Sequence, residues 1–305
     1  MRRGAARNHW RDYMKPKYKI VQDPRYGFLR ADPTPTEAEI EQYYREEFYS
    51  SNRFNDSALD LQQEEREFFD CRWENMYRRC AALLGRSEFS LFDVGFGYAQ
   101  ALLYFRDKGV QVSGLDPAPQ GVEYARAQGL DVHRAGIEDF GCVGERRFDV
   151  VTILNVLEHL RDPAHTLLDL KSRLLMPGGL LVVEVPNEFN DFQVVADQEY
   201  GLDQWWVCPP THLNYFSNDS LKSLLEQCGY EVIASEASFP LELFMLLGEV
   251  YVGNPDIGKD CHNRRVSFEA LMRKHGKGAK LARFYEALAG LNLGRQVLMY
   301  ARPKS

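Results

Sequence analysis

The chain has 305 residues, of which 45% are hydrophobic, so one large domain with additions can bury a sizeable core. Its 37 basic and 44 acidic residues give a net charge of -7, which argues against a general nucleic-acid binder, because such proteins usually carry a strongly basic face. No apolar run approaches the length of a membrane span.

The first 85 residues are predicted to form a mostly helical extension or cap. The segment "PTPTEAEIEQYY" is typical of a helix start, because Thr36 can cap the helix and Glu39 follows three residues later. A longer helix is predicted from a stripe of apolar residues at helical spacing. The stripe is interpreted as core packing, and a substrate role for some of its aromatic rings is the alternative. The stripe consists of Phe69, Trp73, Met76, Tyr77, Cys80 and Leu84.

The start of the chain is also basic. It is either a solvated arm or a surface for an anionic substrate or partner. The basic residues are Arg2, Arg3, Arg7, Arg11, Lys15, Lys17 and Lys19.

From Phe89 onward, short apolar runs alternate with helical stretches, which is typical of a parallel α/β sheet. The predicted helices include one capped by Asp162 that stops at "MPGG", and one that begins at Ser217 and stops at Gly229. Strands are predicted at "SLFDVG", "VQVSGLD", "LDVHR", "FDVVTIL", "GLLVVEV", "GYEVIASEASF" and "LGRQVLMYARPK".

The first of these strands runs into the glycine turn "LFDVGFGYAQ". Gly95 and Gly97 match the start of a dinucleotide fingerprint, but Gln100 replaces its third glycine, and this disfavours a nicotinamide cofactor. No Gly-Lys-Ser/Thr follows, so the turn is not a P-loop. Asp116 lies about twenty residues further on, where an acid can bind both ribose hydroxyls. Since Asp93 can face a cationic group, a ligand with a ribose, an ammonium and no phosphate fits, and S-adenosylmethionine is such a ligand.

The cysteines give no sign of a metal or disulfide framework. All six are scattered without a CxxC pair, so reduced thiols in the cytoplasm are the simplest interpretation. Neither Cys208 with His212 nor Cys261 with His262 supplies four zinc ligands, and we therefore predict no metal.

Several motifs occur in a specific order from about residue 85 to 237: "LFDVGFGYAQ", "GLDPAP", "AGIEDF", "FDVVTILNVLEHLRDP", "LLMPGGLLVVEVPN" and "HLNYFSNDSLKSLLEQCGYEV". Together with the last strand they resemble the class I S-adenosylmethionine-dependent methyltransferases. The segment "YGFLRADPTPTEAEIEQYY" resembles a subgroup often found in polysaccharide or small-molecule tailoring. No cysteine precedes Cys71, so the zinc knuckle of many such relatives is not expected.

The resemblance implies a Rossmann-like, seven-stranded sheet whose last strand is antiparallel. This methyltransferase domain would span residues 86–305, with substrate-capping insertions near 188–216 and 240–292. Gly136 stands where relatives often carry an adenine-binding acid, so Ile137 and Glu138 are expected to take that role. The complete expected cofactor-binding set is Asp93, Gly95, Gly97, Asp116, Pro117, Ile137, Glu138, Asn155, Val156 and His159.

Other residues are candidates for the acceptor site. His212, in "CPPTHLNYFS", is either a general base or a ring that holds its loop in place. His159 lies either near the mouth of the site or in a structural hydrogen bond. Tyr200, Trp205 and Trp206 form either an aromatic wall for the acceptor or a local core.

The function predicted from these features is methyl transfer from S-adenosylmethionine to a small-molecule or sugar-type acceptor, most simply at oxygen. The alternative is a methyltransferase-like binding module without activity. The expected partner is a small molecule, sugar- or lipid-linked and anionic, with no nucleic acid; the sequence does not indicate an oligomeric state.

Overall fold

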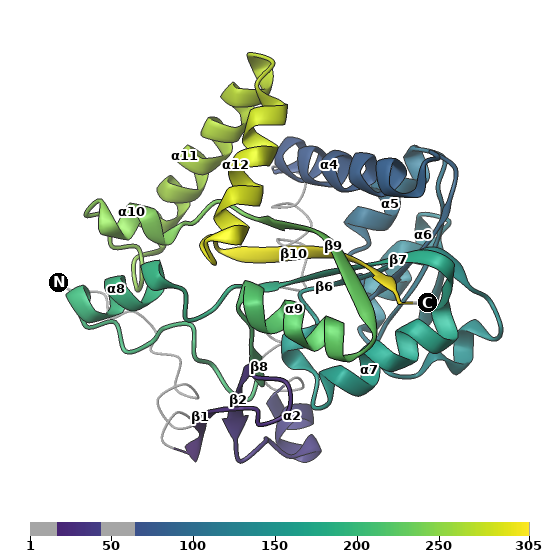
Figure 1. Cartoon of the computed structure of the whole chain (residues 1–305), viewed down its shortest axis with the longest axis horizontal. Helices are drawn as coiled ribbons and strands as arrows, with labels where there is room; N and C mark the ends of the chain where they lie inside the picture. Colours follow the sequence, from purple (N-terminus) through teal and green to yellow (C-terminus); the bar gives the residue numbers. More distant parts are fainter. Residues whose placement is uncertain (1–16, 44–64, 305) are drawn as a thin grey trace.

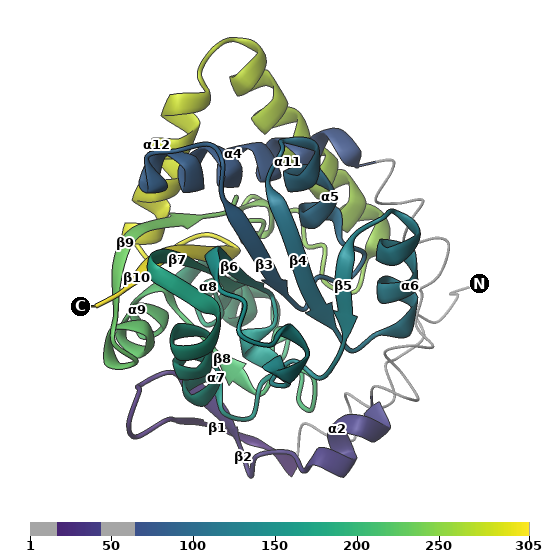
Figure 2. The same cartoon turned by 90° about the vertical axis from the view of Figure 1, so that its right-hand side faces the viewer.

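The computed structural model describes residues 17–43 and 65–304. A seven-stranded sheet runs through its centre in the order β5-β4-β3-β6-β7-β10-β9 (Figures 1 and 2). The first five strands of that order are parallel, and β10 runs antiparallel between β7 and β9. This confirms the predicted fold class. The strands are β3 (Ser90–Val94), β4 (Gln111–Asp116), β5 (Asp131–Arg134), β6 (Phe148–Leu154), β7 (Leu175–Pro186), β9 (Tyr230–Ala237) and β10 (Gln296–Pro303).

Helices cover both faces of this sheet (Figure 2). One hydrophobic core lies under α4, α5 and α6, and a second lies under α7 and α9. Their bounds are α4 (Arg66–Leu84), α5 (Gln100–Asp107), α6 (Pro119–Ala127), α7 (Pro163–Asp169) and α9 (Asn218–Gln227), with short 3₁₀ turns η4 (Phe140–Val143) and η5 (Leu157–His159). Parallel sheets need this cover, because both faces of their strands are apolar.

The helix starts follow from local capping, as predicted. Thr36 and Glu39 exchange hydrogen bonds at the start of α2 (Glu37–Tyr43), and Asp162 accepts a hydrogen bond from the His165 amide. Ser217 forms a capping box at the start of α9. Such caps satisfy amides that have no partner within the helix.

One boundary differs from the prediction. A π-helical turn (η6, Leu170–Leu174) continues α7, and β7 begins at once with Leu175, so the "MPGG" segment belongs to the strand. Gly179 makes this possible, because a Cβ there would lie 2.9 Å from the Met176 carbonyl oxygen.

The described N-terminal residues also contain a small sheet that was not predicted. Strands β1 (Lys19–Gln22) and β2 (Leu29–Asp32) are antiparallel, and β2 also pairs with β8 (Asn214–Tyr215). Strands this short show no clear periodicity, and the third strand comes from far along the chain. The basic residues from Arg2 to Lys15 lie outside the described residues. Lys17, the next basic residue, forms an ion pair with Glu39.

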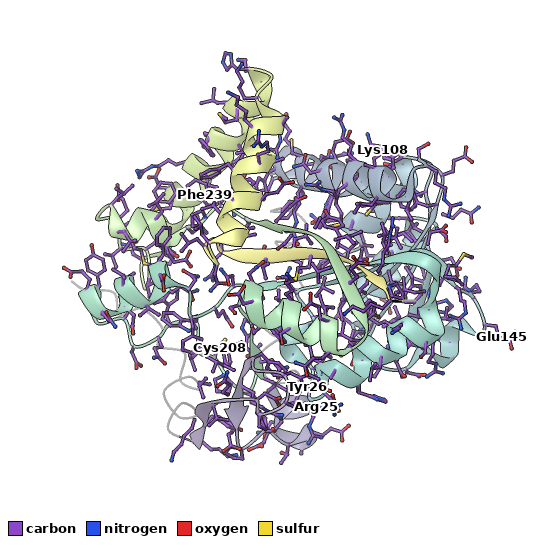
Figure 3. All side chains as sticks on the ribbon, in the orientation of Figure 1. Arg25, Tyr26, Lys108, Glu145, Cys208 and Phe239 are labelled. Atoms are coloured by element: carbon purple, nitrogen blue, oxygen red, sulfur yellow. The ribbon has the colours of Figure 1, made fainter. Side chains whose placement is uncertain are left out.

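The second insertion is largely helical, whereas the first contains one helix followed by turns and loop. The first contains α8 (Asp191–Tyr200), and the second contains α10 (Glu242–Leu246), α11 (Pro255–Lys274) and α12 (Gly278–Gly290). Helices α11 and α12 rise beside α4 at one end of the molecule (Figure 1). Phe239, labelled in Figure 3, links α10 and α11 by packing against Phe244 and Phe268. None of the described helices has the length and apolar character needed to cross a membrane.

Candidate functional site

The glycine turn after β3 has a backbone that only glycine adopts without strain. Gly95 and Gly97 have φ values of 78° and 56°. A Cβ on Gly95 would lie 2.5 Å from Val156 Cγ2 and 3.4 Å from Ile137 Cδ1. Two residues predicted to bind the cofactor, Val156 and Ile137, therefore press directly on this turn.

A third glycine supports the turn from an unexpected place. A Cβ on Gly121, in α6, would lie 2.2 Å from the carbonyl oxygen of Gly97. In a dinucleotide fingerprint the third glycine, here replaced by Gln100, allows close packing of the first helix. Here the next helix, α6, makes the close approach. Sequence reasoning missed Gly121 because it lies outside the motif.

Asp116 holds the turn in place. Its carboxylate accepts hydrogen bonds from the Gly97 amide at 2.8 Å and the Ala118 amide at 2.7 Å. The structural role weighed for this residue is therefore present. Each carboxylate oxygen has a second lone pair, so the predicted contact with ribose hydroxyls remains open to it. Burial raises the pKa of Asp116 to about 6, and the two amides partly offset this.

Asp93 is buried at the end of β3. Its Oδ1 accepts a hydrogen bond from the Thr152 hydroxyl at 2.6 Å. Burial raises the pKa of Asp93 to about 7, and the Thr152 hydrogen bond opposes the shift. A nearby cation would favour the ionised form of this carboxyl group.

A cavity of about 220 Å³, here called the turn cavity, opens beside these groups. Asn155 lies in its wall, with a left-handed φ of 55°, and accepts a hydrogen bond from Gln296 Nε2 at 2.7 Å. Helix α4 adds Phe69 and Trp73, from the aromatic stripe for which a substrate role was the alternative, and Arg72, which was not singled out in the sequence. The lining residues that matter below are Phe69, Arg72, Trp73, Asp93, Gly95 and Gly97.

The other predicted cofactor residues surround this region without lining the cavity. Pro117 is exposed between Asp116 and Ala118. Glu138 accepts a hydrogen bond from the Thr166 hydroxyl at 2.9 Å, so one of its oxygens holds α7. A contact between these residues and adenine stays a prediction.

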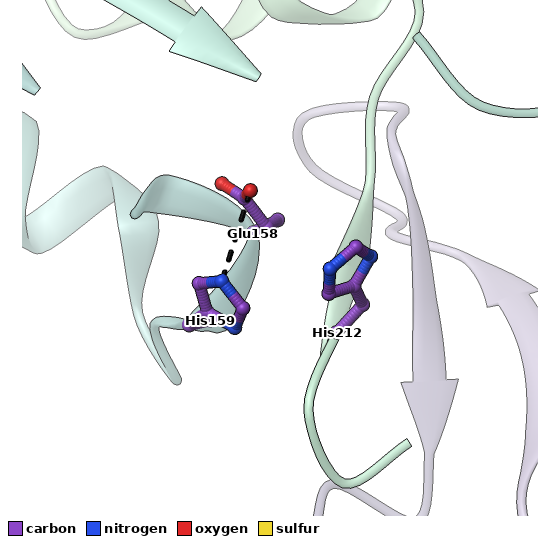
Figure 4. Close-up of side chains that lie close together, drawn as sticks. All are labelled: Glu158, His159 and His212. Carbon is purple, nitrogen blue, oxygen red and sulfur yellow. Dashed lines mark ion pairs between the residues drawn. The ribbon is translucent and has the colours of Figure 1, made fainter. Parts of the chain in front are cut away.

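Two residues just beyond β6, one residue just beyond β7 and His212 form a largely buried group, here called the histidine cluster, and Figure 4 draws all of them except Glu188. It consists of Glu158, His159, Glu188 and His212. His159 Nδ1 donates to the Thr211 carbonyl at 2.7 Å, and His212 Nδ1 lies 3.0 Å from Glu188 Oε1. The two imidazole rings meet edge to face at 5.1 Å between centroids. The structural hydrogen bond considered for His159 is thus present.

In the histidine cluster, two carboxylate oxygens have no hydrogen-bond partner among the described residues. They are Glu158 Oε2 and Glu188 Oε2, and both are buried. Burial raises the pKa of Glu158 to about 8. Burial alone would lower the pKa of His212, but the Glu188 carboxylate raises it well above 6.5. The cluster therefore retains protons at neutral pH.

Possible metal ligands also meet here. One ligand atom from each of Glu158, His159 and His212 lies within 4.8 Å of the others. The sequence analysis considered His212 only with Cys208, because the spacing along the chain does not reveal its approach to η5. No metal was predicted, and the fold brings together three ligands where a structural zinc site has four.

The predicted aromatic wall is largely a local core. Trp206 is buried, and its edge-to-face partners include Trp205 and Phe189. This packing matches the local-core interpretation, and the N-terminal hairpin covers it. Tyr200 belongs elsewhere, since its hydroxyl donates to the Met245 carbonyl at 3.0 Å and joins α8 to α10.

A second cavity, about 300 Å³ in volume, lies under α4, α11 and α12, and is here called the roof cavity. It shares Phe69 and Arg72 with the turn cavity, so the two adjoin. Its charged lining was not predicted, because it comes from helices and strands that lie far apart in sequence. The charged and titratable lining residues are Glu65, Arg72, Glu184, Glu236, His262, Arg265, Glu269, Arg273, Tyr285 and Arg295.

Comparison with known proteins places these features in a family. A family model described as a methyltransferase domain matches residues 64–235, more than half of the chain. A ubiquinone biosynthesis O-methyltransferase of Cereibacter sphaeroides is 29% identical over 151 residues, which cover 47% of this chain and 60% of that protein. One of Xanthomonas oryzae is 34% identical over 103 residues, 32% of this chain and 43% of that protein. The chain thus spans about half the length of these curated relatives.

Solved structures share the fold. A SAM-dependent methyltransferase from Archaeoglobus fulgidus has a TM-score of 0.51 at 16% identity, covering 81% of this chain and 99% of its own. A Burkholderia thailandensis 1,6-didemethyltoxoflavin-N1-methyltransferase, solved with its substrate and S-adenosylhomocysteine, has the same score and identity. That match covers 94% of this chain and 100% of the other.

Proposed function

Because the chain belongs to the class I S-adenosylmethionine-dependent methyltransferases, we propose that it methylates a hydroxyl oxygen of a small molecule. The cofactor of this family is S-adenosylmethionine. An inactive binding module, the alternative from the sequence, is not supported by this membership. The partial relatives named above are O-methyltransferases, which favours oxygen as the acceptor atom.

The observation that carries the proposal is the pair of adjoining cavities. The turn cavity lies at the carboxyl end of β3, where ligands bind in open α/β sheets. The roof cavity opens beside it, with Phe69 and Arg72 between the two. Two adjoining chambers suit a reaction that must align a methyl donor with an acceptor.

The side chains of the turn cavity fit the cofactor. Its wall contains the Asp93 carboxyl group, and the turn rests on the Asp116 carboxylate. The Asp93 carboxyl group suits the sulfonium and ammonium groups of S-adenosylmethionine, because a nearby cation favours its ionised form. The ring of Trp73 adds an aromatic surface that a sulfonium tolerates.

When bound, S-adenosylmethionine supplies an electrophilic methyl group: the acceptor oxygen bonds to that carbon, the C–S bond breaks with its electrons going to sulfur, and the hydroxyl proton leaves. We propose that His212 takes this proton at Nε2, while Glu188 orients the ring through Nδ1. The histidine cluster begins three residues after Asn155, which lines the turn cavity. His212 itself is not among the described residues that line either cavity, so its role as base needs a direct test.

Calorimetry with S-adenosylhomocysteine tests the cofactor assignment. The product should bind the wild-type chain and raise its Tm, because it binds only the folded state. NAD is the control and should do neither. A Tm shift with NAD and none with S-adenosylhomocysteine would reverse the assignment. Mass spectrometry with sugar, aromatic and lipid-linked hydroxyl compounds then identifies the acceptor.

A further inference from the structure

The acids of the roof cavity all have partners. Glu184 pairs with Arg72, Glu236 with Arg79 at 2.8 Å, and Glu269 accepts from Tyr285 at 2.8 Å. The remaining pairs are Glu269 with Arg273 at 3.4 Å and Glu65 with His262 at 3.0 Å. Glu184, Glu236 and Glu269 are therefore matched by donors, and Glu65 lies beside His262 Nε2, which forms no hydrogen bond with a described residue.

One cation of the cavity is not matched. Arg72, Arg273 and Arg295 each form an ion pair with a glutamate, but Arg265 forms none with a described residue. Its Nη2 donates to the neutral side chain of His262, at Nδ1, over 2.7 Å. Its Nε is buried without any hydrogen-bond partner among the described residues.

The surroundings of Arg265 hold its guanidinium in place but do not neutralise it. The group lies over the ring of Phe68, with 4.6 Å from Cζ to the centroid. Burial lowers the pKa of Arg265, and the more distant Glu269 only partly offsets this. Burying a charge without a counter-charge is costly, so such a group gains most from an anion that enters the cavity.

We propose that the roof cavity binds the methyl acceptor through an anionic group, a carboxylate or a phosphate, held by Arg265. The inference rests on the proposed function, because the roof cavity is taken as the acceptor site from its contact with the turn cavity. The planar guanidinium presents parallel donors that match both oxyanions. His262 positions the guanidinium through Nη2, which leaves Nε for the ligand.

Calorimetry on the full chain tests this with three probes: inorganic phosphate, benzoate and the neutral benzamide. Each is titrated with and without S-adenosylhomocysteine. The variants are Arg265→Gln, Arg265→Lys and the control Arg264→Gln. Arg264 is the preceding residue of α11, and its ion pairs with Glu249 and Asp260 are exposed.

We expect phosphate or benzoate to bind the wild type and Arg264→Gln, and to bind Arg265→Gln at least about tenfold more weakly, since charged hydrogen bonds are lost. The oxyanion that binds better identifies the kind of acceptor. Benzamide should not bind comparably. Equal binding to Arg265→Gln and wild type, no binding of either anion, or equal binding of benzamide would overturn the proposal.

Two further outcomes remain informative. If Arg265→Gln does not fold, Arg265→Lys decides, because it keeps the charge but loses the planar donors; wild-type benzoate affinity in that variant would contradict the proposal. If S-adenosylhomocysteine does not bind but an anion still binds through Arg265, the proposed function fails while the anion site stands.

Discussion

The histidine cluster and the roof cavity are both buried and polar, but their charges are unbalanced in opposite directions. In the cluster, one carboxylate oxygen of Glu158 and one of Glu188 lack a hydrogen-bond partner among the described residues, although Glu188 also pairs with His212. In the roof cavity, the arginine without a carboxylate partner among the described residues is Arg265, whose Nε also lacks a hydrogen-bond partner there. The pKa values of the two histidines shift in opposite directions because of this difference in charge. Glu188 raises the pKa of His212, whereas burial and Arg265 lower the pKa of His262.

This contrast separates two tasks that methylation of a hydroxyl group requires. A region with surplus acid attracts a proton, which suits the acceptance of the proton that the hydroxyl loses. A region with surplus cation attracts an anion, which suits binding of the acceptor. The same residue type, histidine, thus serves different ends because its neighbours differ.

The largest expected effect separates the two histidines in catalysis. His212→Gln should slow single-turnover methyl transfer by about 10²–10⁴-fold if His212 is the general base, with cofactor affinity unchanged. His262→Gln should slow it less than about tenfold, because His262 only positions Arg265. The wild-type rate should rise with pH as His212 loses its proton, at a pH above 6.5.

The pH profile decides the first prediction. The rising limb should disappear in His212→Gln and persist in His262→Gln. A fully active His212→Gln, or an unchanged limb, would leave the histidine cluster without a catalytic role.

The second prediction tests whether the acids of the roof cavity depend on their partners. Arg72→Met should lower the free energy of unfolding by about 2–3 kcal/mol, because Glu184 would stay buried without its cation. Arg78→Met is the control on the same helix. Its pair with Glu74 is largely exposed, so the loss should be at most about 1 kcal/mol in urea unfolding. An equal loss of unfolding free energy in Arg72→Met and Arg78→Met would show that Glu184 does not depend on its arginine partner.

The third prediction concerns Asp116, which lies in neither region, holds the glycine turn and is expected to bind the cofactor. Asp116→Ala should weaken S-adenosylhomocysteine binding at least about tenfold, because charged hydrogen bonds are lost. The control Asp131→Ala removes an exposed carboxylate from the neighbouring strand and should bind normally. Unchanged affinity in Asp116→Ala, measured by calorimetry, would sink its assignment to the ribose.

The smallest effect is on stability against pH, with opposite signs for the two histidines. The folded pKa of His212 is raised, so its stabilisation is complete below pH 6.5 and is lost as pH rises through that folded pKa. The folded pKa of His262 is lowered, so its stabilisation is present above pH 6.5 and is lost as pH falls through that folded pKa.

Melting curves from pH 5 to 9 measure this. The difference in Tm between the wild type and His212→Gln should shrink toward high pH. The difference in Tm between the wild type and His262→Gln should shrink toward low pH. If both differences in Tm changed with pH in the same direction, the two histidines would not lie in electrostatically opposite environments.

Much of the fold could be predicted because its signals are local. The strand before the glycine turn, the caps at Thr36, Asp162 and Ser217, and the spacing from the turn to Asp116 each depend on a short stretch of chain. The expectation for Tyr200 was less successful, because proximity in sequence to Trp205 did not place the two side chains together.

The sequence by itself determined the parallel sheet, the glycine turn and the class of cofactor, since hydrophobic period, capping and motif order are written along the chain, and the resemblance to the family implied the antiparallel last strand. Only the tertiary structure decided that Gly121 supports the turn, that β8 completes a sheet with β2, and that His212 meets Glu188. It also decided that Arg265 faces the roof cavity without a carboxylate partner among the described residues. The physical reason is that charge balance depends on which side chains share a buried volume, and helices far apart in sequence meet there only once the core has packed.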